Sequence, residues 1–287
     1  MRRIFPLVLL LACSPEPRKL SATGLYEARV VEYSPQFPLW SDGMEKTRWI
    51  LLPQGEAIDT SDMNDWRFPV GTKLWKEFSK DGAPVETRLL HKAGPEERDW
   101  TRTTYQWKED GSEAIRIKAK KNVDCGSCHD NVGGGVLGFS AVQLPHETLA
   151  ELVDDGALSD PPDLFPSVPG DAVAQAALGT LHANCGSCHN PASNVDWVDL
   201  QLHLDVHLMA DVESTPTYQT AVIVPSGVDP IEDLGVDCLI RPGMPEESLV
   251  WLRMNERDAE WSMPPLGSDR VDRTGADVVA EWITSLQ

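Results

Sequence analysis

Long hydrophobic runs are missing from all but the start of this 287-residue chain. The longest, IFPLVLLLA at 4–12, has nine apolar residues, whereas a helix needs about 20 to cross a bilayer. The sequence therefore excludes a membrane-spanning helix. With 41% hydrophobic residues over this length, one or two soluble domains with sizeable cores are expected.

Lysine is missing from residues 131–287, which carry 5 arginines against 25 acidic residues, a net charge near −20 (5 − 25). The preceding stretch, 14–130, is nearly balanced, with 18 basic and 20 acidic residues. Nucleic acid and anionic lipid surfaces are poor partners for the acidic half. Its acidity either serves solubility or steers the protein toward a partner with a basic docking face.

A leader precedes the rest of the chain. Arg2 and Arg3 come before the apolar run and Cys13 follows it, which is typical of a secretory signal. The stretch LLAC at 10–13 resembles a bacterial lipobox, which implies removal of residues 1–12 and attachment of lipid to Cys13. An ordinary signal peptide is the alternative. We expect a protein of the cell envelope, periplasmic or associated with the outer membrane, held to the membrane by lipid alone.

The first half of the mature chain is predicted to be β structure. Asp-Gly between alternating runs is a strong hairpin signal. Two such hairpins are expected, at 72–78 and 85–92 around Asp81-Gly82, and at 103–108 and 114–120 around Asp110-Gly111. Six of the ten tryptophans precede residue 110, and we expect them to pack a small antiparallel sandwich or barrel rather than to form a sugar-binding surface.

The second half is predicted to be helical at both ends. Four prolines at 159–170 mark a linker, and a helix is expected to start after it at Asp171. A terminal helix is expected to begin at Thr274. Between the helices, alternation at 201–209 predicts a strand.

The pentapeptide CGSCH occurs twice, in surroundings that do not match. Two thiols separated by two residues can add to the two vinyl groups of haem, and the histidine that follows can bind the iron. The spacing therefore predicts two covalently attached haems c. Cys125, Cys128 and the iron ligand His129 would hold the first, and Cys185, Cys188 and the iron ligand His189 the second.

Other roles for paired cysteines explain less. A thioredoxin-like motif expects a βαβ setting, which neither copy has. A zinc site built from both pairs leaves the two histidines without a role. Two structural disulfides are compatible with export and stay open as an alternative.

Residues 171–287 resemble a cytochrome c domain. The second motif ends a predicted helix, in which Ala177 and Leu181 match the small and bulky positions of the first cytochrome helix. In that family a later methionine is the distal iron ligand, so the resemblance implies this role for Met263 in WSMPPLGSD. A His/Met ligand pair raises the reduction potential. Met254 and Met244 are the alternatives.

The first haem has no comparable methionine. Its candidate distal ligands are His91, His146 and His182. Without one of them, its iron keeps an open position. Cys238 is left over once four cysteines are assigned to haem and one to lipid, and we expect it to be buried.

The wider chain is similar to a family of largely uncharacterised bacterial cell-envelope proteins that carry cytochrome c domains. The family implies haem and electron transfer, with no established substrate. The resemblance is carried by LSATGLYE (20–27), PLWSDGMEKTRWILLP (38–53), IDTSDMNDWRFPVGTKLWKEF (58–78), VLGFSAVQL (136–144) and LHANCGSCHNP (181–191).

We therefore expect an α+β multidomain protein. Its parts would be the signal at 1–12, a β-rich domain at 13–130 ending in the first haem motif, a connecting segment at 131–170 and an all-α cytochrome c-like domain at 171–287. The expected function is one-electron transfer between redox proteins of the envelope rather than catalysis. The alternatives are a dihaem peroxidase with an open first haem, and a binding module whose β domain docks a polymer or protein.

Overall fold

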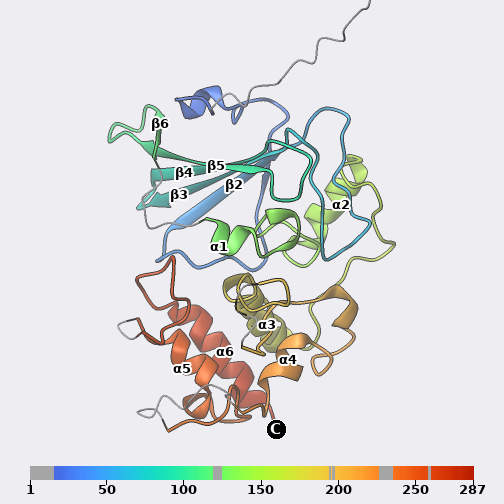
Figure 1. The fold of residues 1–287 in the computed structure, drawn as a ribbon, viewed down its shortest axis with the longest axis vertical. Coiled ribbons are helices and arrows are strands. Elements are labelled where there is room, and N and C mark those ends of the chain that lie inside the picture. The colour runs from blue at the N-terminus through green and yellow to red at the C-terminus, as the bar shows by residue number, and fades with distance from the viewer. Residues whose placement is uncertain (1–15, 119–124, 194, 196–197, 226–234, 258–259) are drawn as a thin grey trace, which may run out of the picture.

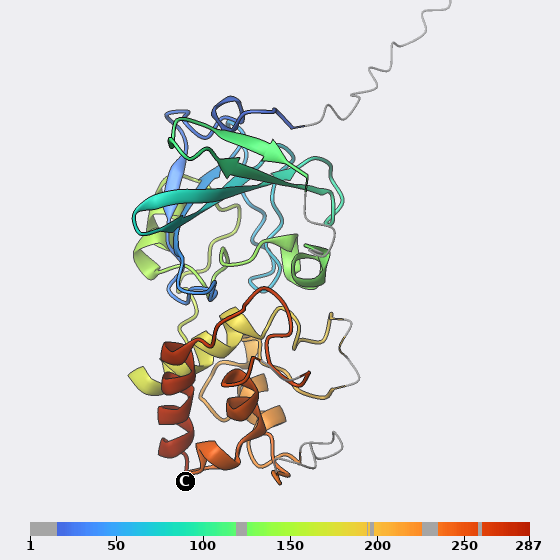
Figure 2. The ribbon, with the colours of Figure 1, turned by 90° about the vertical axis from the view of Figure 1, so that its left-hand side faces the viewer.

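Figure 1 shows the computed structural model, which describes residues 16–118, 125–193, 195, 198–225, 235–257 and 260–287. A β-sheet part lies above a part with short helices, and Figure 2 shows the same two layers after a quarter turn. The leader and Cys13 lie outside the described residues, so lipid attachment stays a prediction. Within those residues, we find no helix with the length and apolar character required to cross a membrane.

The sheet has six antiparallel strands in sequence order, and both Asp-Gly hairpins are confirmed. Asp81 has a φ of 52° and Gly111 a φ of 65°, the left-handed conformation that such turns require. Each strand pairs with the next along the chain, so the result is one open sheet rather than the predicted sandwich or barrel. The strands are β1 (Val31–Tyr33), β2 (Glu45–Leu51), β3 (Lys73–Lys80), β4 (Ala83–Lys92), β5 (Trp100–Trp107) and β6 (Ala114–Ile117).

Both faces of the sheet are covered, because its strands carry apolar residues on either side. One face packs Trp75 and its neighbours against the N-terminal segment, which includes the short helix η1 (Leu20–Ala22). The other face packs against Trp66 and against the segment that contains α2 (His146–Asp154). Trp66, Trp75 and Trp100 are at most 7% exposed, which confirms the predicted core role for these three. The other three, Trp40, Trp49 and Trp107, are only half-buried.

Two helices of thirteen residues each pack together in the C-terminal part, α3 (Ala172–Asn184) and α6 (Arg273–Ser285). Asp171 caps α3 as predicted, since its carboxylate accepts a hydrogen bond of 2.9 Å from the Ala174 N–H. The terminal helix begins earlier than predicted, because Asp272 rather than Thr274 is its cap. Asp272 accepts a hydrogen bond of 3.0 Å from the Gly275 N–H.

The prediction of an all-α cytochrome c-like domain at 171–287 is wrong. Helices α4 (Pro216–Ala221) and α5 (Leu249–Met254) have only six residues each, and extended segments connect them. Isolated bridges join Val222 to Ile240 and Pro225 to Cys238, so this part is held by backbone pairing as well as by helices. The fold as a whole is β-rich with short helices.

The strand predicted at 201–209 is also wrong, since its described backbone contains only the 3-10 helix η3 (Val206–Leu208). Asp205 caps this helix by accepting a hydrogen bond of 2.9 Å from the His207 N–H. A side chain that bonds the local backbone in this way competes with strand pairing. A further 3-10 helix, η4 (Pro245–Glu247), precedes α5.

The segment at 35–43 ties the two parts together. The Phe37 ring lies against α3 at Gly179, where a Cβ atom would overlap it. The Asp42 carboxylate accepts hydrogen bonds of 2.9 Å from the backbone N–H groups of both Asp269 and Arg270. An N-terminal segment therefore helps to build the C-terminal part.

Candidate functional site

The two CGSCH motifs lie against each other where the sheet part meets the C-terminal part. The first forms most of the short helix α1 (Gly126–His129), and the second follows the end of α3. The Cys128 and Cys188 thiols are hydrogen-bonded to each other, and Cys188 Sγ also donates to the Ser127 carbonyl at 4.0 Å. Figures 1 and 2 both place α1 between the sheet and the C-terminal helices.

The four motif cysteines are unpaired and half-buried. The hydrogen bond between the two thiols lowers the pKa of Cys188 and raises the pKa of Cys128. Burial raises the pKa of Cys185 to about 12. One thiol of the touching pair therefore ionises readily, and the thiolate is the nucleophilic form of cysteine.

His129 is held in a defined tautomer. Its Nδ1 atom lies 2.8 Å from the carbonyl oxygen of Gly135. A carbonyl can only accept, so Nδ1 carries the proton and Nε2 keeps its lone pair. Burial lowers the pKa of His129 to about 4, which keeps the ring neutral. A neutral imidazole oriented through its other nitrogen is the form that binds a metal.

Two glycines after the first motif position that carbonyl. Gly134 and Gly135 have φ values of 65° and 73°, which side chains rarely allow. A Cβ atom at Gly134 would overlap the Trp66 carbonyl oxygen, and one at Gly135 would lie 2.9 Å from Trp100 Nε1. The Trp100 indole N–H donates to the Gly134 carbonyl at 2.9 Å. The run Gly133–Gly135 (η2) was the sequence signal for this support, and its role was not predicted.

His189 occupies the corresponding place in the second motif. Burial lowers its pKa, and its Nδ1 atom lies near the Leu200 backbone without a well-formed hydrogen bond. Arg253 acts electrostatically on His189, and Arg257 acts on Cys185. The Nε atoms of both arginines are buried without a hydrogen-bond partner in the described residues. The second motif is thus flanked by unsatisfied cationic donors that sequence analysis missed.

The Met263 loop is anchored to the same two arginines. The Met263 N–H donates to the Arg253 carbonyl at 2.9 Å, and Arg257 Nη2 donates to the Met263 carbonyl at 2.6 Å. Met254 instead packs in the hydrophobic core, and Met244 is 44% exposed. The structure therefore brings the predicted ligand loop to the residues that flank the second motif.

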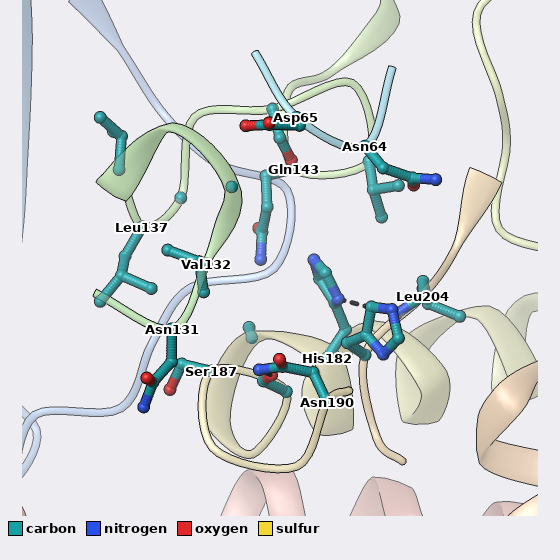
Figure 3. Close-up of a pocket in the computed structure, with 18 of the residues that line it drawn as sticks. Asn64, Asp65, Asn131, Val132, Leu137, Gln143, His182, Ser187, Asn190 and Leu204 are labelled. Atoms are coloured by element: carbon teal, nitrogen blue, oxygen red, sulfur yellow. Dashed lines mark hydrogen bonds between the residues drawn. The ribbon is translucent and has the colours of Figure 1, made fainter. Parts of the chain in front are cut away.

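The three histidines considered for the first haem lie in different places. His91 Nδ1 contacts Glu16 at 2.5 Å, and His146 Nε2 lies 3.2 Å from the Ser167 hydroxyl. His182 is half-buried on the wall of the cavity described below, and its Nδ1 accepts a hydrogen bond of 3.0 Å from the Leu204 N–H (Figure 3). Because burial lowers the pKa of His182 to about 4, the neutral ring carries its proton on Nε2. His182 is therefore an N–H donor in this state, not a metal ligand.

A cavity of about 500 Å³ opens between the two motifs and the sheet (Figure 3). Its volume lies within the range of small-molecule and cofactor sites. Its walls include Asn131 after the first motif, Ser187 inside the second, and His182. Arg48 and Lys76 of the sheet line it as well. Residues that directly follow the first motif, residues of the second motif and strands of the sheet thus line one shared space.

Comparison with protein-family models, with curated proteins and with solved structures finds no match to this chain. The described residues also contain no group of three or more histidine, cysteine or acidic side chains arranged to hold a metal ion. The function is therefore argued from the motifs and from the site alone.

Proposed function

We propose that the chain is an exported c-type haem protein that attaches two haems covalently and passes single electrons between proteins of the cell envelope. Cys125 and Cys128 would attach one haem, with His129 as its iron ligand. The matching residues of the second motif are Cys185, Cys188 and His189, with Met263 as the proposed distal ligand. Bound haem would supply a one-electron couple whose potential is tuned by the axial ligands and the surrounding charges.

One observation carries this proposal, the hydrogen bond of 2.8 Å between His129 Nδ1 and the Gly135 carbonyl. It leaves Nε2 of a neutral imidazole free for a metal, directly after two unpaired thiols. A surface histidine needs no such support, whereas an iron ligand requires a fixed ring. The residues of the second motif also fit haem, because the buried Nε atoms of Arg253 and Arg257 could bind its propionate groups.

The test is the mass of the denatured full chain, produced in a host with haem-attachment enzymes. We expect two haem masses that survive denaturation. The double variant Cys125→Ala/Cys128→Ala and the double variant Cys185→Ala/Cys188→Ala should each retain one. Cys238→Ala is the matched control and should retain both haems, because the Cys238 thiol is buried and donates a hydrogen bond to the Ile240 carbonyl. A wild-type chain without haem mass contradicts the proposal.

The partner proposed for the acidic half is a redox protein with a basic docking face. Residues 131–287 have no lysine and a charge near −20 (5 − 25). Opposite charges speed encounter, and salt screens them beyond about 8 Å at physiological ionic strength. Electron exchange with a basic redox protein should therefore slow as salt is added. A rate that does not change with salt would assign the acidity to solubility alone.

A second candidate function is the reduction of peroxide at the first haem, and the cavity is the observation that favours it. His182 presents an Nε2–H group beside the first motif, and Arg48 adds a cation to the same walls. Reduction of hydrogen peroxide to two waters takes two electrons and two protons, and two haems can supply the electrons. Carbon monoxide binding by the reduced protein, together with rapid peroxide turnover that is lost in His182→Leu, would favour this function over simple electron transfer.

A further inference from the structure

Three basic residues stand directly opposite one another across the middle of the sheet. The strand registers pair Arg48 of β2 with Lys76 of β3, and Lys76 with Arg88 of β4. Like charges on directly opposed residues destabilise a sheet. Arg48 and Lys76 lie on the same face of the sheet as Ile50 and Leu74. This face packs in the hydrophobic core that also contains residues of the segment after the first motif.

These three cations are not equivalent. Arg88 is half exposed and forms an ion pair of 2.5 Å with Glu86. Arg48 is only 6% exposed, and both Arg48 and Lys76 line the cavity between the motifs. In the described part of the chain, no carboxylate forms an ion pair with Arg48 or Lys76.

Three acidic residues also line the cavity, Asp65, Glu97 and Asp130. Asp130 forms an ion pair with Arg102, and Asp65 Oδ2 lies 3.8 Å from Arg67. Asp65 Oδ1 is buried without a hydrogen-bond partner in the described residues, but neither Asp65 nor Glu97 forms an ion pair with Arg48 or Lys76 there. Burial, together with the neighbouring Arg48, lowers the pKa of Lys76 to about 7. The guanidinium of Arg48 is expensive to bury without an ion pair, and an anion in the cavity would stabilise it together with the charged form of Lys76.

Neutral hydrogen-bond donors line the same cavity. The side-chain amides of Asn131, Gln143 and Asn190 are on its walls, together with His182 (Figure 3). The amides of Asn131 and Asn190 already donate to the Ser127 and Gly186 carbonyls, and each keeps one N–H for the oxygens of an anion. Lys76 also interacts electrostatically with Cys128, which places the cations beside the first motif.

We propose that Arg48 and Lys76 together bind a carboxylate group in this cavity. The carboxylate belongs either to a propionate of the haem on the first motif, which rests on the function proposed above, or to a small free carboxylate. A guanidinium fork and an ammonium group on adjacent strands bind both oxygens of one carboxylate.

The test compares Arg48→Gln and Lys76→Gln with the control Arg88→Gln, all in the full chain produced with haem-attachment enzymes. Arg88 belongs to the same cross-strand row but is exposed and already paired, so it controls for charge on the sheet. A redox titration measures both haem potentials, and calorimetry measures binding of succinate. Lys76 is only half-buried, so Lys76→Gln should fold even if Arg48→Gln does not, and it then provides the test.

If the carboxylate is a haem propionate, both cavity variants lower one haem potential more than Arg88→Gln does, and succinate does not bind. The reason is that a nearby cation favours the reduced, less positive iron. If it is a free carboxylate, the wild type binds succinate, and each cavity variant weakens binding at least about tenfold, as expected for loss of a charged hydrogen bond.

The proposal is overturned if succinate does not bind and the haem potentials of the cavity variants match those of Arg88→Gln. The mass of the chain separates this outcome from failure of the haem proposal. If the chain carries no haem, calorimetry remains as the test. Succinate binding that is weakened by Arg48→Gln then supports the site, and a lack of succinate binding overturns the proposal.

Discussion

The thiols of Cys128 and Cys188 are hydrogen-bonded to each other, although 60 positions (188 − 128) separate them in the sequence. Each is the second cysteine of its motif, so the two attachment sites meet at equivalent positions. Haems attached there would be neighbours, and electrons could pass between them without a partner protein. The contact also makes a prediction that does not depend on haem.

The full chain produced without haem-attachment enzymes should form a Cys128–Cys188 disulfide on mild oxidation. Their thiols already lie within hydrogen-bond range, and one of them ionises readily. Peptide mapping of the oxidised protein identifies the bond, and Cys128→Ser should abolish it. Disulfides confined to Cys125–Cys128 and Cys185–Cys188 would show that the motifs do not meet.

Met263→Ala should open one haem iron to external ligands and lower its reduction potential, because a thioether favours the ferrous state. Imidazole binding, followed by absorption spectroscopy, and a redox titration check both effects. The other haem should be little changed. Met244→Ala is the control, since Met244 is exposed. Imidazole binding that is equal in the two variants would remove Met263 from the ligand set.

Gly134→Ala should destabilise the fold by about 3 kcal/mol or more, because the added Cβ meets the Trp66 carbonyl in a left-handed backbone conformation. Gly111→Ala has a similar φ and open space around it, and should cost only about 1 kcal/mol. Denaturant unfolding of the two variants gives the comparison. Equal losses would mean that the Trp66 contact is unimportant.

Gly179→Ala should destabilise the wild-type protein but stabilise a Phe37→Ala variant. In the wild type the new methyl group overlaps the Phe37 ring, and overpacking of this kind costs about 1–3 kcal/mol. In a Phe37→Ala background the ring is gone, and the same change should stabilise α3 by about 1 kcal/mol, the helix preference of alanine over glycine. Unfolding of the four proteins in a double-mutant cycle measures this. A loss in both backgrounds would contradict the packing seen here.

Features with local causes were predictable from the sequence. Asp-Gly turns and alternating runs specify the hairpins around Asp81 and Gly111, and the side chain of Asp171 specifies the start of α3. The motif spacing likewise places each histidine directly after its cysteine pair. In these cases a few consecutive residues carry the whole signal.

Features that depend on distant segments were not predictable. The bridge between Val222 and Ile240 replaces part of the expected all-α domain, and its two sides pair only in the folded chain. Lys76 lies in the alternating run at 72–78, and only the strand register sets Arg48 opposite it beside a cavity. The meeting of Cys128 and Cys188 depends on how the two parts dock.

The two hydrogen bonds that Asp42 accepts from residues 269 and 270 constrain the order of folding. These partners lie 227 and 228 positions after Asp42 in the sequence. Such contacts of long sequence separation slow folding. In an exported chain the two segments would meet only after translocation, and until they meet the second CGSCH motif stays accessible to haem-attachment enzymes.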